Sequence, residues 1–189
     1  MKTGRPEIPV LVLHLLALAL TLGPPLFFGA VVAPASFRLL PTRDLAASLQ
    51  SPILTRLCWM LQGGFALLFL TSWLLCRWRR GPRVLTALLT RAPILGIIGA
   101  VVIEKLLIPP IDKIRAEAPG LIDNLPAADP GRMLLARYHR LATTIFAVEI
   151  AAAALVLLAT ARLLRAEGAG APPSSAPPAA PKLLDLGGL

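Results

Sequence analysis

The stretch LATTIFAVEIAAAALVLLATA, residues Leu141–Ala161, decides the fold class of this chain. Its 21 residues include one ionisable residue, Glu149, and three threonines, and all the others are apolar. An α-helix of this length spans about 30 Å, which matches the hydrocarbon core of a lipid bilayer. The stretch is therefore predicted to cross a membrane as a helix.

Three further apolar runs precede it, at Ile8–Val32, Cys58–Cys76 and Val84–Ile103. Of the 189 residues, 56% are hydrophobic and 15% are charged, whereas soluble domains carry about 25% charged residues. We therefore predict an all-α, polytopic membrane protein with a four-transmembrane-helix bundle over residues 1–165. The Ala-, Pro- and Gly-rich tail, 166–189, is predicted to be disordered because it cannot bury enough apolar surface to fold.

The charges fit a membrane protein better than a nucleic-acid-binding protein. The net charge is +9, but most Lys and Arg lie just outside the apolar runs, where membrane topology explains them. Four spans place both termini and the turn Arg77–Arg83 on one side, and this turn concentrates four arginines in seven residues. By the positive-inside rule, we predict that both termini are cytoplasmic. The high content of Ala, Leu, Arg and Pro suggests a bacterial inner membrane.

Glu149 is the polar residue that most needs an explanation. It lies about eight residues, or roughly 12 Å, inside the fourth run. An ionisable group at this depth costs a few kcal/mol, so it should face the bundle interior and have a partner. Arg91 in the third run is one candidate partner, and Thr143 or Thr144 could bond a protonated Glu149. Both a proton-handling role and a structural role are compatible with the sequence.

His14 and His139 are candidate cofactor ligands, because paired histidines are common axial ligands of haem. They lie near the starts of runs that begin on opposite sides of the membrane. Their imidazoles are therefore expected to be ~20 Å or more apart across a core of ~30 Å, which argues against a shared haem. One histidine alone stays a candidate ligand for haem or a metal.

Small residues recur in the apolar runs and are predicted to allow close approach of helices, within the bundle or with partner helices. They are Gly29, Ala33, Gly63, Gly64, Gly96 and Gly99. Two proline pairs interrupt the pattern, because proline lacks a backbone donor and clashes with the preceding turn. Pro24-Pro25 is predicted to kink the first helix, and Pro109-Pro110 to end the third.

Two blocks of sequence resemble the transmembrane protein 205-like family. The first, GAVVAPASFRLLP at Gly29–Pro41, carries Pro34-x-x-Phe37 before a basic residue. The second lies before the fourth run and contains Asp129, Pro130, Arg132 and His139. The resemblance implies a four-helix integral membrane protein and brings no biochemical activity with it. Where the family tends to carry Ser and Asn early in its fourth helix, this chain has Ala142 and Phe146.

The sequence favours a non-enzymatic membrane protein that is an accessory to transport or membrane assembly, or that handles a small molecule. No catalytic set, phosphate-binding loop or metal-ligand spacing is found, so no catalytic or metal residue and no cofactor is predicted. Two alternatives stay open. One is a membrane redox, metal-binding or haem-binding protein that uses His14 or His139. The other is a proton-coupled small-molecule transporter that uses Glu149 as a homo-oligomer. The expected partners are the lipid bilayer, a second copy and other membrane proteins.

Overall fold

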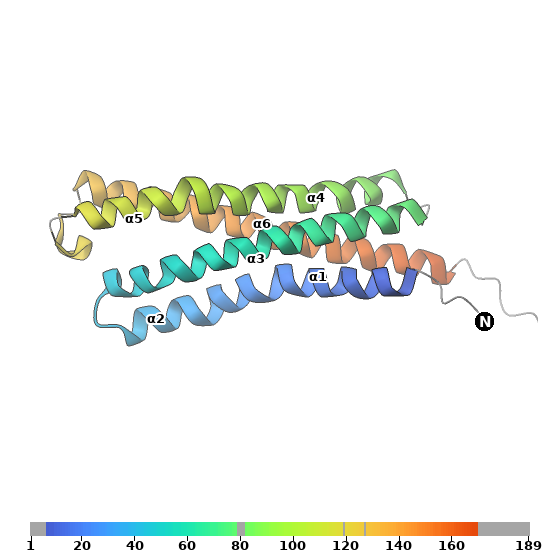
Figure 1. The fold of residues 1–189 in the computed structure, drawn as a ribbon, viewed down its shortest axis with the longest axis horizontal. Helices are drawn as coiled ribbons and strands as arrows, with labels where there is room; N and C mark the ends of the chain where they lie inside the picture. The colour runs from blue at the N-terminus through green and yellow to red at the C-terminus, as the bar shows by residue number, and fades with distance from the viewer. Residues whose placement is uncertain (1–6, 79–81, 119, 127, 170–189) are drawn as a thin grey trace, which may run out of the picture.

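The computed structural model describes residues 7–78, 82–118, 120–126 and 128–169, and this part of the chain is all-α. It forms a bundle of long helices (Figure 1), of which four are long and apolar enough to cross a membrane. The predicted fold class, a four-helix membrane bundle, is confirmed. Of the predicted tail, 166–169 continue the last helix, and 170–189 lie outside the described residues.

Four long helical segments follow one another through the described residues. In chain order their elements are α1 (Glu7–Phe27), η1 (Phe28–Val32) and α2 (Ala33–Leu39); α3 (Arg43–Trp78); α4 (Arg83–Val102), η2 (Ile103–Leu107) and α5 (Ile108–Glu117); η3 (Ile122–Asn124) and α6 (Pro130–Ala169). The elements η1 and η2 are π-helical turns, and η3 is a short 3₁₀ helix. Each π-helical turn lies inside one membrane-spanning helix and joins two α-helical parts.

Pro41 and Thr42 separate the first long helix from the second. Leu40 has an extended backbone, φ −91° and ψ 143°, as expected for a residue that precedes a proline, here Pro41. Thr42 then caps α3, because its hydroxyl accepts a hydrogen bond of 3.2 Å from the Leu45 amide. Capped in this way, α3 begins well before the apolar run at Cys58–Cys76 and presents additional side chains to the bundle.

The prediction that Pro109-Pro110 ends the third helix is wrong. The helix continues through both prolines to Glu117. Immediately before them, in η2, the backbone N–H of Ile108 bonds to the carbonyl of Ile103, five residues back. The wider π turn accommodates the missing proline donors and the bulk of the rings at the start of α5.

The four segments surround a common core. The helix α1 packs against α3 and α6, and α4 packs against the same two helices. The Phe65 ring is fully buried, and a Cβ at Gly96 would lie only 2.5 Å from it. Gly96 therefore provides the space for this ring, as its predicted packing role requires. Gly29 and Gly63 have no atom within 4 Å of an added Cβ, so the predicted close packing at these two positions is wrong within this bundle.

Candidate functional site

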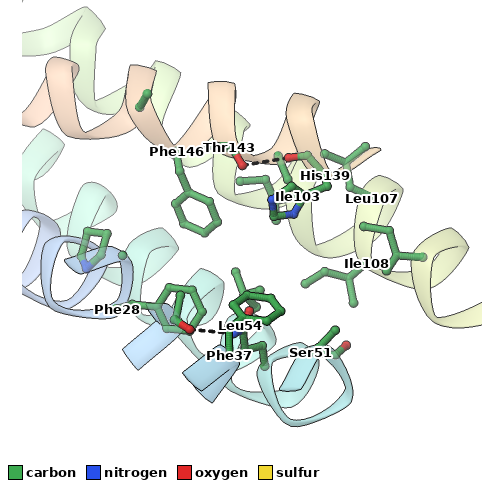
Figure 2. A pocket seen from close by; sticks show the side chains of 18 of the residues that line it. Phe28, Phe37, Ser51, Leu54, Ile103, Leu107, Ile108, His139, Thr143 and Phe146 are labelled. Carbon is green, nitrogen blue, oxygen red and sulfur yellow. Dashed lines mark hydrogen bonds between the residues drawn. The ribbon is translucent and has the colours of Figure 1, made fainter. Parts of the chain in front are cut away.

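A cavity of about 510 Å³ lies toward the end of the bundle that α2 and α5 form. There, α1 and α6, which pack together near the termini, diverge toward α2 and the start of α6 (Figure 1). Side chains from all four segments line the space: Phe28 and Phe37 face Phe146 and His139 across it (Figure 2). Its volume lies within the range of small-molecule sites, about 300–1,000 Å³.

The cavity opens sideways. Phe37, His139 and Thr143 line it and are also exposed on the surface of the bundle. All three lie within segments that are long and apolar enough to cross a membrane. The space is therefore accessible from the side of the bundle.

Most polar side chains of the lining lie toward one end of the cavity. Its outer end, near the α2–α3 connection, carries Gln50, Ser51, Arg115 and His139. Its inner end is closed by apolar residues, namely Pro25, Phe28, Phe146, Ala147 and Ile150. Such a gradient fits a molecule that has one polar end and one apolar end.

Hydrogen bonds hold two of the polar side chains at the outer end. The Ser51 hydroxyl donates to the Asp112 carboxylate, with distances of 2.9 Å and 2.8 Å to its two oxygens, and thereby ties α3 to α5. The Gln50 amide donates to the hydroxyl of Ser36 on α2. These links fix the relative positions of α2, α3 and α5 around the opening.

Both π-helical turns lie in the cavity wall. Phe28 and Gly29 of η1 and Ile103 and Leu107 of η2 are lining residues. A π turn inserted in an α-helix redirects the side chains that follow it and is frequent at functional sites. The two turns therefore set which side chains of α2 and α5 face the space.

One part of the predicted family signature forms the cavity wall. Gly29, Ala33, Pro34 and Phe37 line it from the first segment, and His139 lines it from α6. Ala142 and Phe146, where the resembled family tends to carry Ser and Asn, also line it, and both make this wall more apolar. Sequence reasoning marked these positions as helix-packing residues and gave no signal for a cavity, because the space arises from the divergence of two helices.

The other part of the signature starts a helix. The carboxylate of Asp129 accepts a hydrogen bond of 3.0 Å from the Arg132 amide, which caps the N-terminus of α6. Pro130 occupies the first helical position, where its missing N–H has no cost. The Arg132 guanidinium bonds to the Leu125 carbonyl and anchors the preceding connection. Asp129, Pro130 and Arg132 are thus structural residues of the α5–α6 connection.

Glu149 faces the bundle interior, as predicted, but lacks the predicted partners. Its side chain is 2% exposed, and neither carboxylate oxygen has a hydrogen-bond partner among the described residues. Arg91 is exposed on α4, where its long side chain can extend toward the interface. Thr143 and Thr144 bond to carbonyls of their own helix. The predicted pairing with Arg91 or with these threonines is therefore wrong.

A glycine provides the space for this carboxylate. A Cβ at Gly99 would lie 2.5 Å from Glu149 Oε1. The carboxyl group therefore lies directly against the backbone of α4, in a notch that only glycine leaves open. The predicted role of Gly99 in close helix contact is confirmed, although the close neighbour is a side chain and not a second backbone.

A second buried carboxylate, Glu104 in η2, was assigned to no site by the sequence, because it adjoins Lys105 at the end of an apolar run. It accepts a hydrogen bond of 2.6 Å from the Gln62 amide and forms an ion pair with Lys105 at 2.6 Å. The buried Cys58 side chain packs against Ile103 and Leu107 of the same π-helical turn. The sequence signal for this interaction is Gln62, a polar residue about one turn into the second run.

His14 is fully buried near the start of α1. Its Nδ1 atom lies 3.0 Å from Thr71 Oγ1, and its Nε2 atom lies 2.9 Å from Thr160 Oγ1. Both ring nitrogens are therefore occupied by hydroxyl groups of α3 and α6. This arrangement is a hydrogen-bonded structural histidine, which leaves no nitrogen free for a metal.

His14 and His139 lie at opposite ends of the bundle. Thr160, which contacts His14, and His139 are both on α6 and 21 residues apart, which corresponds to about 30 Å along a helix. The two histidines therefore cannot ligate one haem iron. Among the described residues, no group of three or more His, Cys, Asp or Glu side chains is arranged to hold a metal ion.

The cavity and the polar residues are thus the features from which a function must be inferred. The resemblance to the transmembrane protein 205-like family stays a prediction that rests on the two sequence blocks. Comparison of the chain with protein-family models, with curated proteins and with solved structures found no match.

Proposed function

We propose that this protein binds a hydrophobic or amphipathic small molecule from the bilayer and acts as a non-enzymatic accessory to transport. The cavity of about 510 Å³ is the observation that carries the proposal. It lies within the membrane-spanning helices, its wall is mainly apolar, and it opens to the side. A molecule that is poorly soluble in water is the class of ligand that such a site selects.

The proposed setting is a bacterial inner membrane with both termini cytoplasmic. Because the cavity lies toward the end of the bundle opposite the start of α1, its polar mouth would then face the periplasmic leaflet. An accessory protein in this position would present its ligand to another membrane protein or to a second copy. The exposed apolar surface of the helices, including Leu16, Leu95 and Leu158, is available both to lipid and to such partners.

A second candidate, a proton-coupled transporter, is favoured by Glu149. A buried carboxyl group without a hydrogen-bond partner is costly inside a membrane, and such groups mark ion and proton pathways. Uptake driven by a proton gradient in vesicles, and lost in Glu149→Gln, would support this function. The haem-binding alternative has less support, because both ring nitrogens of His14 already contact threonine hydroxyls.

The binding proposal can be tested by photolabelling in nanodiscs of phosphatidylcholine. The probe is hexadecanol with a diazirine at the end of its chain. We expect saturable labelling of peptides that contain Phe146 or Ile150, at the inner end of the cavity. Competition by unlabelled hexadecanol identifies the saturable part.

Two matched variants separate the cavity from the general lipid surface. Gly29→Leu fills the cavity, and an added Cβ at Gly29 meets no atom within 4 Å, so the variant should fold. Gly63→Leu is the control, because Gly63 is equally open and lies outside the cavity. Gly29→Leu should abolish saturable labelling and Gly63→Leu should preserve it. Equal labelling of the two variants would contradict the proposal.

A further inference from the structure

One cationic side chain lies at the mouth of the cavity. Among the described residues that line it, Arg115 is the one with a full formal charge, and no carboxylate is part of the lining. The Arg115 Nε atom is buried and has no hydrogen-bond partner among the described residues. A guanidinium group has five N–H donors, so this side chain has donor capacity to offer to a ligand.

Two carboxylates lie near this arginine and are not part of the cavity lining. Asp112 and Asp44 lie near the guanidinium group, and Asp112 is also bonded by Ser51. Both carboxylates lower the positive electrostatic potential around the guanidinium group. A single anionic group therefore fits the mouth better than a multiply charged one.

The length of the cavity fits one hydrocarbon chain. Arg115 at the mouth and Ile103 at the inner part are 12 residues apart in the third segment, which corresponds to about 18 Å along a helix. With a volume of about 510 Å³, the space is long and narrow. These dimensions suit a single extended chain.

We propose that the cavity binds a single-chain amphiphile with a carboxylate head group, that is, a fatty acid. Its carboxylate bonds to the guanidinium group of Arg115, and its chain runs inward between Phe28 and Phe146. Charge-assisted hydrogen bonds from arginine to a carboxylate are about twice as strong as neutral ones. This inference rests on the proposed function and adds the chemical class of the ligand.

The experiment compares two probes in the same phosphatidylcholine nanodiscs: hexadecanoic acid and hexadecanol, each with a diazirine at the end of its chain. The apparent Kd of each is taken from the saturation of labelling at Phe146 and Ile150. The acid should bind about tenfold more tightly than the alcohol, since one charged hydrogen bond contributes about 1.5 kcal/mol or more.

Variants of the arginine identify the source of this preference. Arg115→Gln should weaken binding of the acid about tenfold and leave binding of the alcohol unchanged. Arg115→Lys keeps the charge and should retain most of the preference for the acid. Retained binding in this variant would show that the loss in Arg115→Gln is due to the missing charge and not to misfolding. Lys113→Gln is the control, because this exposed cation of α5 lies outside the cavity.

The outcomes separate this inference from the proposed function. If acid and alcohol bind equally, or if Arg115→Gln leaves the binding of the acid unchanged, the fatty-acid inference is wrong and the proposed function stands. If neither probe labels the cavity saturably, both are wrong. If the alcohol binds more tightly than the acid, the ligand is an uncharged amphiphile and the inference is again wrong.

Discussion

The Nε2 atom of His14 lies 2.9 Å from Thr160 Oγ1, and this contact joins the first span to the last across 146 residues of sequence. The Nδ1 atom of the same ring lies 3.0 Å from Thr71 Oγ1 on the second span. One imidazole thus connects three of the four membrane-spanning segments. Both threonine oxygens also lie within hydrogen-bond distance of carbonyls of their own helices. Because a hydroxyl has one proton and a neutral imidazole has one N–H, the tautomer of the ring decides which threonine donates to it and which accepts from it.

Thr160→Val should lower the free energy of unfolding by about 1–3 kcal/mol, because it leaves a buried ring nitrogen without a partner. Combined with His14→Leu, the loss should be smaller than the sum of the two single losses by about 1 kcal/mol. Unfolding in mixed micelles with an increasing fraction of dodecyl sulfate measures these values. Thr144→Val is the control, since its hydroxyl is exposed and bonds only to Arg140 of its own helix. Strict additivity of the two variants would show that the contact has no energetic weight.

Gly99→Ala should destabilise the bundle by about 1–3 kcal/mol, because the added methyl group overlaps Glu149 Oε1 at 2.5 Å and Ile145 Cγ2 at 3.0 Å. Glu149→Ala in the same background should recover most of the loss, whereas Glu149→Gln, with its equal size, should not. Gly63→Ala, at a position without neighbours, should be neutral or slightly stabilising. The same micelle titration measures the free energy of unfolding of each variant. An unchanged value in Gly99→Ala would mean that α4 and α6 are farther apart than the 2.5 Å contact requires.

Conversion of the two buried carboxylates into amides should affect the free energy of unfolding differently. Glu149→Gln should not lower the free energy of unfolding, because neither oxygen of Glu149 has a hydrogen-bond partner to lose. Glu104→Gln should lower it, because the ion pair with Lys105 disappears and the bond from Gln62 loses its charge-assisted character. Melting temperatures of the two variants in one detergent provide the comparison. A larger loss in Glu149→Gln than in Glu104→Gln would reveal a partner for Glu149.

Asp129→Ala should cost about 1 kcal/mol, within the usual range for loss of an N-cap, since it leaves the Arg132 amide without its acceptor. Asp129→Asn keeps an oxygen at the same place and should retain most of the stability. Hydrogen exchange of the first turn of α6 reports the effect locally. Faster exchange in Asp129→Ala alone is expected, and equal exchange in both variants would argue against a capping role.

The fold class could be predicted from the sequence because it depends on hydrophobic run lengths, as at Leu141–Ala161. The burial of Glu149 could also be predicted, because lipid excludes an ionisable group from the outer face of a helix. Its contact with Gly99 could not, because the rotation of α6 relative to α4 depends on the packing of all four segments. The predicted partner Arg91 was wrong for the same reason, since its long side chain can reach the interface without entering the bundle.

The cavity was the largest omission of the sequence-based prediction. Gly29, Ala33 and Phe37 were recognised as a signature, but small residues indicate close packing and open space equally well. The decision between the two depends on where α1 and α6 diverge, and no local pattern encodes this. The proline pair Pro109-Pro110 was interpreted as a helix end because the sequence gives no sign that the turn before it is wide.

The two π-helical turns make the cavity sensitive to insertions and deletions. Each turn accommodates an additional residue in its helix, and one residue corresponds to a rotation of about 100° around the helix axis. Removal of a single residue from η1 would therefore turn Phe37 away from the cavity, and the same change in η2 would turn Arg115 away. The number of residues in each segment therefore determines which side chains face the cavity. Residues that do not line the cavity thus influence which molecule it could accept.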